Sequence, residues 1–501
     1  MKHLSVSKLR SAGIVALGAA VVAGCASTGY DGPKPGESRY VSTETVALKA
    51  APDGLSDPVK ELSYKDEVLV KEVKKVAPPF SGDKTMFPEF LIPCWLKVAS
   101  SGTEGFLPMD VLVSDWLIAN QDPTERISAE GMTVAKRGFS EDENMEMASM
   151  RGAAGSGSFL KDADYGAVEK MYLDQRAHPV AFDALKGFIK EGAFEEHPVP
   201  AEVVQVEEKG LVSKFADKSR QTVASTLNES AERTEQKGDP NAKFSGALTK
   251  FGAGFVYSES GPIQEFQIGE SVAAKVLPAY KVVPMDDPRA TYLRKLAHAL
   301  AGASNSPMPY RGLMVILVDS TEVNAFAVPG GFLIVTTGML DFLKDEDELA
   351  SIIGHEIGHL ELKHGMRAVG TEKVLKLFTL LKEAGLAGEN KNDPAAVEVR
   401  RRIDELFGKM FDVVRNGYGV ETESQADWRS LQLCHRLGYD TKALYDVLER
   451  FKSAKGTYGG ASYPAERGAD ILKYRSQLGY TDTPAAGRDV RAARYKAALR
   501  K

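Results

Sequence analysis

Five consecutive residues, 355–359, constrain this chain more than any other segment: they read His-Glu-Ile-Gly-His. They lie inside an apolar run from Leu349 to Leu362, and the acidic residues 345–348 stand just before that run. Acidic residues favour the N-terminus of a helix, and no proline interrupts the segment, so we predict an α-helix here. Residues four apart share one face of a helix, so His355 and His359 would direct their rings to one point.

This spacing is typical of a metal site. Two histidines on one helix face can bind a single Zn²⁺ ion, and Glu356 would lie beside the open coordination position as a general base for water. The alternative is a pair of ordinary core histidines. That alternative would leave Glu356 as a buried carboxylate without a partner, which is costly. We therefore expect one zinc ion per chain and hydrolysis of peptide bonds.

A zinc site of this type needs a third protein ligand. On a continuous helix His364 would be rotated by about 140° from His359, so we expect a structural role for it. Glu423 and Asp427 lie four residues apart and share a predicted helix face. Glu423 is the expected ligand, and Asp427 would accept the N–H of a ligating histidine and fix its tautomer. The alternative is that these acids only begin a solvated helix.

Further motifs accompany the histidine helix between residues 262 and 480. They are Ile268–Glu270, Val323–Phe332, Thr337–Leu340 and Glu423–Asp427. In order and spacing they resemble the zinc metallopeptidase family that contains the CAAX prenyl protease and the heat-shock protease HtpX. The resemblance implies that His355, His359 and Glu423 bind zinc and that Glu356 is the general base.

One segment departs from the pattern of that family. Soluble periplasmic members carry Thr-His-Pro near the C-terminal end, followed by an arginine, and this histidine can hold the metal site inactive. Here the sequence is Ser462-Tyr463-Pro464, with Arg467 after it. Tyr463 is expected either to donate a hydrogen bond to the oxyanion of the tetrahedral intermediate or to be a packing residue.

Two short apolar runs, Leu313–Val318 and Phe332–Val335, are predicted to be strands. The family resemblance places a substrate-binding edge strand between them, at Asn324, Ala325 and Phe326. An extended peptide could pair with such an edge by β-augmentation. The alternative is that these strands are ordinary sheet core.

The N-terminus predicts export. Three basic residues precede Ala12–Ala23, an apolar run too short to span a bilayer comfortably. The segment ending in Cys25 resembles a bacterial lipobox, so we expect removal of residues 1–24 and lipidation of Cys25. The acyl chains would anchor the protein in a membrane. The resemblance implies the outer membrane, with the protein facing the periplasm. A plain cleaved secretory signal is the alternative.

Charge and length exclude some classes of protein. The net charge is −6, and removal of residues 1–24 with their three basic residues makes it −9, which excludes nucleic acid as a natural partner. A chain of 501 residues exceeds what one hydrophobic core usually supports, so we expect more than one domain.

We predict an α+β protein with a β domain at 37–117 and a mostly helical gluzincin-type metalloprotease domain with a small sheet at 262–480. Short apolar runs at residues 46–48, 68–70, 95–98 and 105–107, separated by Gly, Pro and Asp, predict the strands of a small β-barrel in the first. It resembles a bacterial SH3-like domain, for which peptidoglycan is a candidate partner and a spacer role the alternative. Residues 118–260 are expected to be helices and linkers, 370–415 an inserted helical pair, and 481–501 a C-terminal tail.

Together these observations predict a zinc-dependent endopeptidase of envelope proteins. By family analogy its substrates would be misfolded or stalled proteins of the envelope. The alternative is a catalytically silent chaperone or scaffold that contacts the cell wall through the β domain. The intact histidine motif argues against it, because a scaffold has no need of Glu356.

Overall fold

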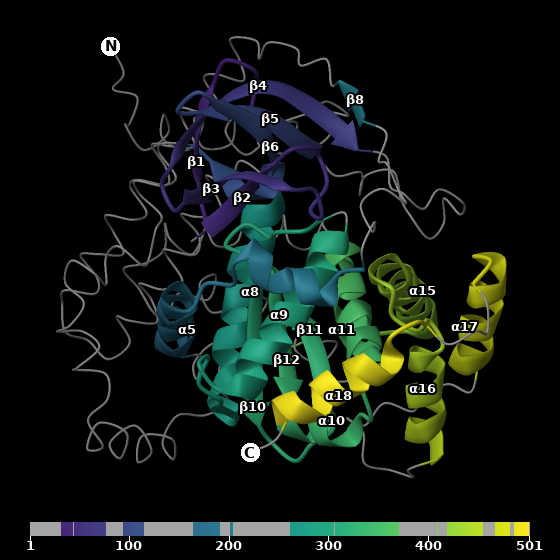
Figure 1. Cartoon of the computed structure of the whole chain (residues 1–501). Coiled ribbons are helices and arrows are strands. Elements are labelled where there is room, and N and C mark those ends of the chain that lie inside the picture. The colour runs from purple at the N-terminus through teal and green to yellow at the C-terminus, as the bar shows by residue number, and fades with distance from the viewer. Residues whose placement is uncertain are drawn as a thin grey trace, which may run out of the picture.

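The computed structural model describes residues 32–43, 45–76, 94–114, 164–190, 201–203, 261–304, 306–369, 408, 418–453, 466–480 and 485–499. Cys25, Tyr463 and most of the predicted 118–260 and 370–415 regions lie outside them. A curled antiparallel sheet is followed by a helical region that encloses a smaller sheet (Figure 1). The α+β prediction is confirmed. Among the described residues, no helix is both long and apolar enough to cross a lipid bilayer.

The strands are β1 (Ser38–Val41), β2 (Thr45–Lys49), β3 (Pro58–Ser63), β4 (Glu67–Val76), β5 (Cys94–Ser100), β6 (Thr103–Pro108), β7 (Leu112–Val113), β8 (Ala201–Val203), β9 (Lys281–Val282), β10 (Met314–Asp319), β11 (Ala325–Val328) and β12 (Phe332–Thr336). The α-helices are α5 (Tyr165–Ala177), α8 (Gly261–Val276), α9 (Pro288–Ala303), α10 (Thr337–Phe342), α11 (Glu346–Glu361), α12 (His364–Val369), α15 (Val420–Leu437), α16 (Ala443–Ser453), α17 (Glu466–Gln477) and α18 (Arg488–Leu499). The described residues also form the short 3-10 helices η2 (Met109–Val111), η4 (Phe182–Phe188) and η5 (Leu277–Ala279).

The N-terminal sheet has the strand order β3-β2-β6-β5-β4-β1-β7, with β8 added to β4. Its longest strand, β4, shows how the sequence sets the inner face. Val68 and Val70 are buried, whereas Glu67, Leu69 and Lys71 are exposed, as expected for a strand with one face in a core. A register shift after Val70 then brings Val73 to the same inner face. The predicted strands around residues 46, 68, 95 and 105 are all present.

A loop of this β region inserts into the helical region. Leu55 is buried in the same hydrophobic core as α9 and α11. Asp53 forms a buried ion pair with Arg436 of α15, and Arg436 also donates a hydrogen bond of 2.7 Å to the carbonyl of Ala303. Gly54 lies so close to Gly302 that a Cβ atom would clash with its carbonyl oxygen. The β region is therefore docked on the helices and is not a separate arm.

The smaller sheet, of order β11-β12-β10-β9, is covered on both faces. Met314, Ile316 and Val318 of β10 face the core shared with α8, whereas Val315 and Leu317 face the core shared with α9 and α11. Burial on both faces explains why β10 reads as a continuous apolar run and not as an alternating pattern.

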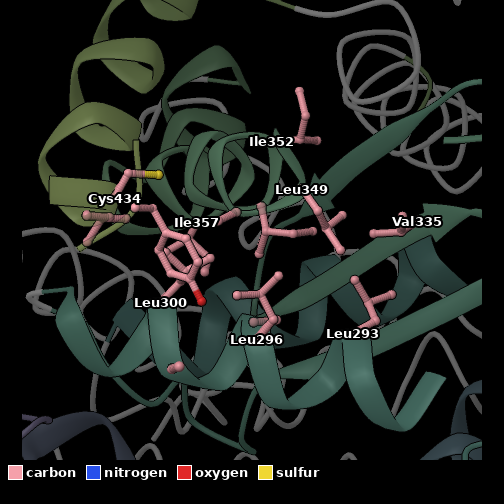
Figure 2. Packing of buried hydrophobic residues seen from close by; sticks show 14 of the residues in the cluster. Leu293, Leu296, Leu300, Val335, Leu349, Ile352, Ile357 and Cys434 are labelled. Atoms are coloured by element: carbon pink, nitrogen blue, oxygen red, sulfur yellow. The ribbon is translucent and has the colours of Figure 1, made fainter. Parts of the chain in front are cut away.

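The larger core lies between α9, α11 and this sheet. Figure 2 shows the side chains that meet there, which are Leu293, Leu296 and Leu300 of α9, Val335 of β12, Leu349, Ile352 and Ile357 of α11, and Cys434 of α15. Helix α11, which carries both histidines of the motif, is thereby packed into the centre of the molecule.

The acidic residues at the start of α11 are buried and paired with arginines. Asp345 caps the helix by accepting a 3.0 Å hydrogen bond from the N–H of Glu348. The next three acids pair with arginines from the C-terminal part of the chain, and these pairs are Glu346–Arg494, Asp347–Arg491 and Glu348–Arg450. Two of these arginines belong to α18, a helix within the predicted C-terminal tail. The helix docks directly on α11.

Substituting Arg491 by Met should destabilise the fold. Asp347 is fully buried and accepts two hydrogen bonds from Arg491, of 2.8 and 2.7 Å. Losing one partner of a buried ion pair leaves an uncompensated charge, so we expect a loss of about 2–4 kcal/mol in the free energy of unfolding, measured by denaturant titration.

The matched control is Val490→Ala, since Val490 lies on the same helix and is 66% exposed. This control should leave stability within about 0.5 kcal/mol of the wild type. The double variant Asp347→Asn/Arg491→Met should regain part of the loss. Equal stabilities of the Arg491 and Val490 variants would contradict the role given to the ion pair.

Candidate metal centre and active site

Helices α11 and α15 pack closely because small residues face each other where they meet. A Cβ atom on Gly354 would lie 3.1 Å from Oγ of Ser430, and one on Gly358 would lie 3.2 Å from the carbonyl oxygen of Ala426. Ser430 also donates a 2.6 Å hydrogen bond to the carbonyl of Ser351. This close approach lets a side chain of α15 reach the histidines of α11.

Three potential metal ligands converge at this contact. Nε2 of His355 and Nε2 of His359 lie 3.0 Å apart, and the Glu423 carboxylate lies 3.4 Å from the first and 3.8 Å from the second. All three ligand atoms lie within 4.8 Å of one another and belong to buried or half-buried residues. Two imidazole nitrogens and one carboxylate oxygen form a donor set that suits Zn²⁺. The residues therefore fit the metal that the sequence predicts.

Asp427 and Arg467 surround these ligands with compensating charge. Nδ1 of His355 lies 2.8 Å from the Asp427 carboxylate. Arg467, on α17, donates two hydrogen bonds to that carboxylate, of 2.8 and 2.6 Å, and its Nη1 lies 3.1 Å from Glu423. Burial lowers the pKa of His355, but the carboxylates of Asp427 and Glu423 outweigh burial and raise this pKa to about 10. The centre thus favours a positive charge between its ligands, as a metal site must.

His359 is held by aromatic and polar neighbours. Its ring stacks on Tyr418, with ring centroids 4.5 Å apart, and the main-chain N–H of Tyr418 donates a 2.9 Å hydrogen bond to Glu423. Nδ1 of His364 lies 2.8 Å from Nδ1 of His359. Burial holds the pKa of His359 well below its usual value. His359 is therefore a neutral ligand candidate.

The expectation that His364 points away from His359 is wrong. That expectation assumed one continuous helix, but α11 ends at Glu361 and Lys363 adopts a left-handed conformation with φ +54°. The chain turns there, and α12 begins at His364, whose ring comes back against His359. His364 contacts the nitrogen of His359 that faces away from the other ligands, so it lies outside the ligand cluster.

Glu356 is a buried carboxylic acid beside the ligands. Burial raises its pKa to about 7, repulsion by Glu423 adds to the rise, and the charge of His355 opposes it. A hydrogen bond from the main chain of Ala327, on β11, also opposes the rise. A pKa near neutrality suits a group that both accepts and returns a proton.

The structure thus brings together the five predicted site residues of α11 and α15, which are His355, Glu356, His359, Glu423 and Asp427, with the predicted edge strand. Tyr463 and Cys25 lie outside the described residues. The sequence reasoning missed the roles of Arg467, Tyr418 and Gln425. Arg467 had a signal, because an arginine follows the same position in the resembled family. Tyr418 and Gln425 had none, since their contacts arise from how α15 is packed.

Comparison with known proteins bears on the region that holds this centre. Residues 287–484 match the model of peptidase family M48. The M48 match covers α9 through α17, and so contains the histidines, Glu423 and Arg467.

Curated relatives carry consistent names. Over 166 residues, 33% of each chain, the protein is 28% identical to a beta-barrel assembly-enhancing protease of Yersinia pestis. It is 27% identical over 165 residues, 33% of this chain, to metalloprotease YcaL of Escherichia coli, and covers 59% of that protein. It is 26% identical over 151 residues, 30% of this chain, to the mitochondrial metalloendopeptidase OMA1 of Bos taurus, and covers 28% of that protein.

The chain therefore spans only part of the length of each of these relatives. Within that part, the M48 match and the relatives' names support a metalloprotease hydrolase, as predicted from the sequence.

Zinc uptake should become tighter as the pH rises. Because the pKa of His355 is about 10, a proton occupies at neutral pH the nitrogen to which the metal would bind. Displacing one proton makes the apparent association constant rise about tenfold per pH unit between pH 7 and 9. Competition with a chromophoric chelator measures this slope.

The variant Asp427→Asn provides a contrast. Its His355 would hold the proton less tightly, so the pH dependence should be shallower. An association constant that does not change with pH in the wild type would exclude proton competition at His355.

Proposed function

We propose that this chain is a zinc-dependent endopeptidase in which His355, His359 and Glu423 hold the metal and Glu356 is the general base. The observation that carries the proposal is the convergence of three ligand atoms beside a buried carboxylic acid. The M48 match of the same residues supports it.

When bound, Zn²⁺ supplies a Lewis acid that polarises a scissile carbonyl and lowers the pKa of water to about 7. Glu356 takes the proton of the attacking water and returns it to the leaving amine, which a pKa of about 7 permits in both directions. Asp427 and Arg467 keep His355 and Glu423 in place, so that little reorganisation is needed during the reaction.

The β11 strand supports a mode of substrate binding. Among the residues that the structure describes, it pairs with β12 alone and forms one edge of the smaller sheet. The N–H of Thr336 donates to the carbonyl of Asn324, so Asn324 directs its main-chain groups toward β12. In an antiparallel pair this direction alternates from residue to residue. Ala325 and Ala327 therefore direct their main-chain groups away from β12, to the open edge. The N–H of Ala327 already donates to Glu356, so an extended peptide would pair with both main-chain groups of Ala325 and with the carbonyl of Ala327. Phe326 faces the core and Asn324 anchors the start of the strand.

The cellular setting belongs to the same proposal. Lipidation at Cys25 would anchor the chain in the bacterial envelope, with its catalytic centre in the periplasm and envelope proteins as substrates. The name of the Yersinia pestis relative, a beta-barrel assembly-enhancing protease, supports this setting. The curled N-terminal sheet would be an SH3-like domain with peptidoglycan as a candidate ligand, and Tyr463 a candidate oxyanion donor.

The variant Glu356→Gln tests the general base. It keeps the shape of the side chain and removes proton transfer, so the rate of casein cleavage by the full chain should fall at least about 100-fold. Zinc content, measured by atomic emission, should stay at one ion per chain because Glu356 is not a ligand.

The outcomes separate the alternatives. One zinc ion per chain without cleavage by the wild type would favour an enzyme whose metal site is held inactive, or a chaperone. Purified, folded protein without zinc would refute the proposed function.

The variant Ala325→Pro tests the edge strand. Proline removes one outward N–H and is tolerated on an edge strand when that N–H faces outward. We expect KM for an extended peptide to rise about tenfold, the value of roughly one hydrogen bond, with zinc content unchanged. Phe326→Pro is the contrast, because it removes an inward N–H and should lower stability instead. An unchanged KM in Ala325→Pro would show that peptides bind elsewhere.

A further inference from the structure

A chain of polar contacts runs from the surface of α12 to the back of His359. Nη1 of Arg367 donates a hydrogen bond to Oε1 of Gln425 at 3.2 Å. Nε2 of His364 lies 3.0 Å from the same oxygen, and Nδ1 of His364 lies 2.8 Å from Nδ1 of His359. His364 and Gln425 are almost completely buried, so water does not compete for these contacts.

When His364 is neutral, only one arrangement of protons satisfies this chain. A guanidinium has donors alone, so the atom of Gln425 that faces Arg367 must be the amide oxygen. That oxygen accepts, so Nε2 of His364 must donate. In a neutral imidazole the other nitrogen is then an acceptor. Nδ1 of His359 must therefore carry the hydrogen, and Nε2 of His359 is left with a free lone pair.

We propose that His364 is a positioning residue that makes Nε2 of His359 the metal-binding nitrogen. The inference rests on the proposed metal site. In the other tautomer of His359, a hydrogen on Nε2 would point toward Nε2 of His355, 3.0 Å away, where the ion has to sit. The relay from Gln425 through His364 excludes that tautomer before any metal arrives.

The two histidine ligands are thus fixed by different means. His355 faces the carboxylate of Asp427, which carries a full negative charge. His359 faces a neutral imidazole, which sets the same tautomer without adding charge. The left-handed conformation of Lys363 brings His364 into this position, and such a conformation is disfavoured for a residue with a side chain.

The test compares two variants of the full chain, His364→Phe and His364→Asn. Phenylalanine keeps a ring in the space but cannot accept a hydrogen bond, so the dissociation constant for Zn²⁺ should rise about 10- to 100-fold. Asparagine can accept the hydrogen of His359 through its side-chain oxygen, so most of the affinity should return. Chelator competition gives the affinities, and unfolding of the metal-free proteins shows whether the variants differ in stability.

If the variants lose stability equally and bind zinc equally, His364 is only a packing residue. A second variant, Gln425→Leu, removes the acceptor that orients His364 and should also weaken zinc binding. Unchanged affinity in both His364→Phe and Gln425→Leu would overturn the proposal.

A direct readout needs no metal. In protein with ¹⁵N-labelled histidine, nitrogen spectra of the metal-free wild type should show the hydrogen of His359 on Nδ1, and His364→Phe should show a mixture of tautomers. A hydrogen on Nε2 of His359 in the wild type would refute the relay. These spectra remain informative if the chain cleaves no peptide, so failure of the relay and failure of the proposed function are distinguishable.

Discussion

The close contact between α11 and α15 is the constraint on which the candidate site depends. The side chain of Glu423 can reach the two histidines only if the two helices pack closely, which requires small residues at their contact. Gly354 and Gly358 on one side and Ala426 and Ser430 on the other provide that surface. Gly358 lies inside the histidine motif, so the same five residues supply both candidate histidine ligands and the space that brings Glu423 near them.

Buried charge is balanced locally at both ends of α11. At its N-terminus, consecutive acids pair with arginines of α16 and α18. Toward its C-terminus, Arg467 lies between Asp427 and Glu423, and Arg429 pairs with Glu361 inside the contact between the helices. Since an unpaired charge in a core is costly, these pairs constrain how the surrounding helices pack around α11.

Much of the fold could be predicted because its signals are local. Strands β2, β4, β5, β6, β10 and β12 follow from short apolar runs between turn residues, and α11 follows from its acidic start and apolar face. The acids at residues 345–348 marked a helix start, but nothing local indicated that their partners lie about 100 to 150 residues away. The position of His364 could not be predicted by counting along a helix, because a single left-handed residue, Lys363, ends the periodicity.

The docked loop at residues 53–55 and helix α18 have a consequence for where this molecule can be divided. The region of homology, residues 287–484, contains neither of them. A fragment cut to those limits would retain Arg436 without Asp53, and Glu346 and Asp347 without their arginines. It would also expose the part of the core that Leu55 covers. The matched segment and the packed structure therefore have different boundaries, and a fragment that keeps these contacts must include residues from both sides of residues 287–484.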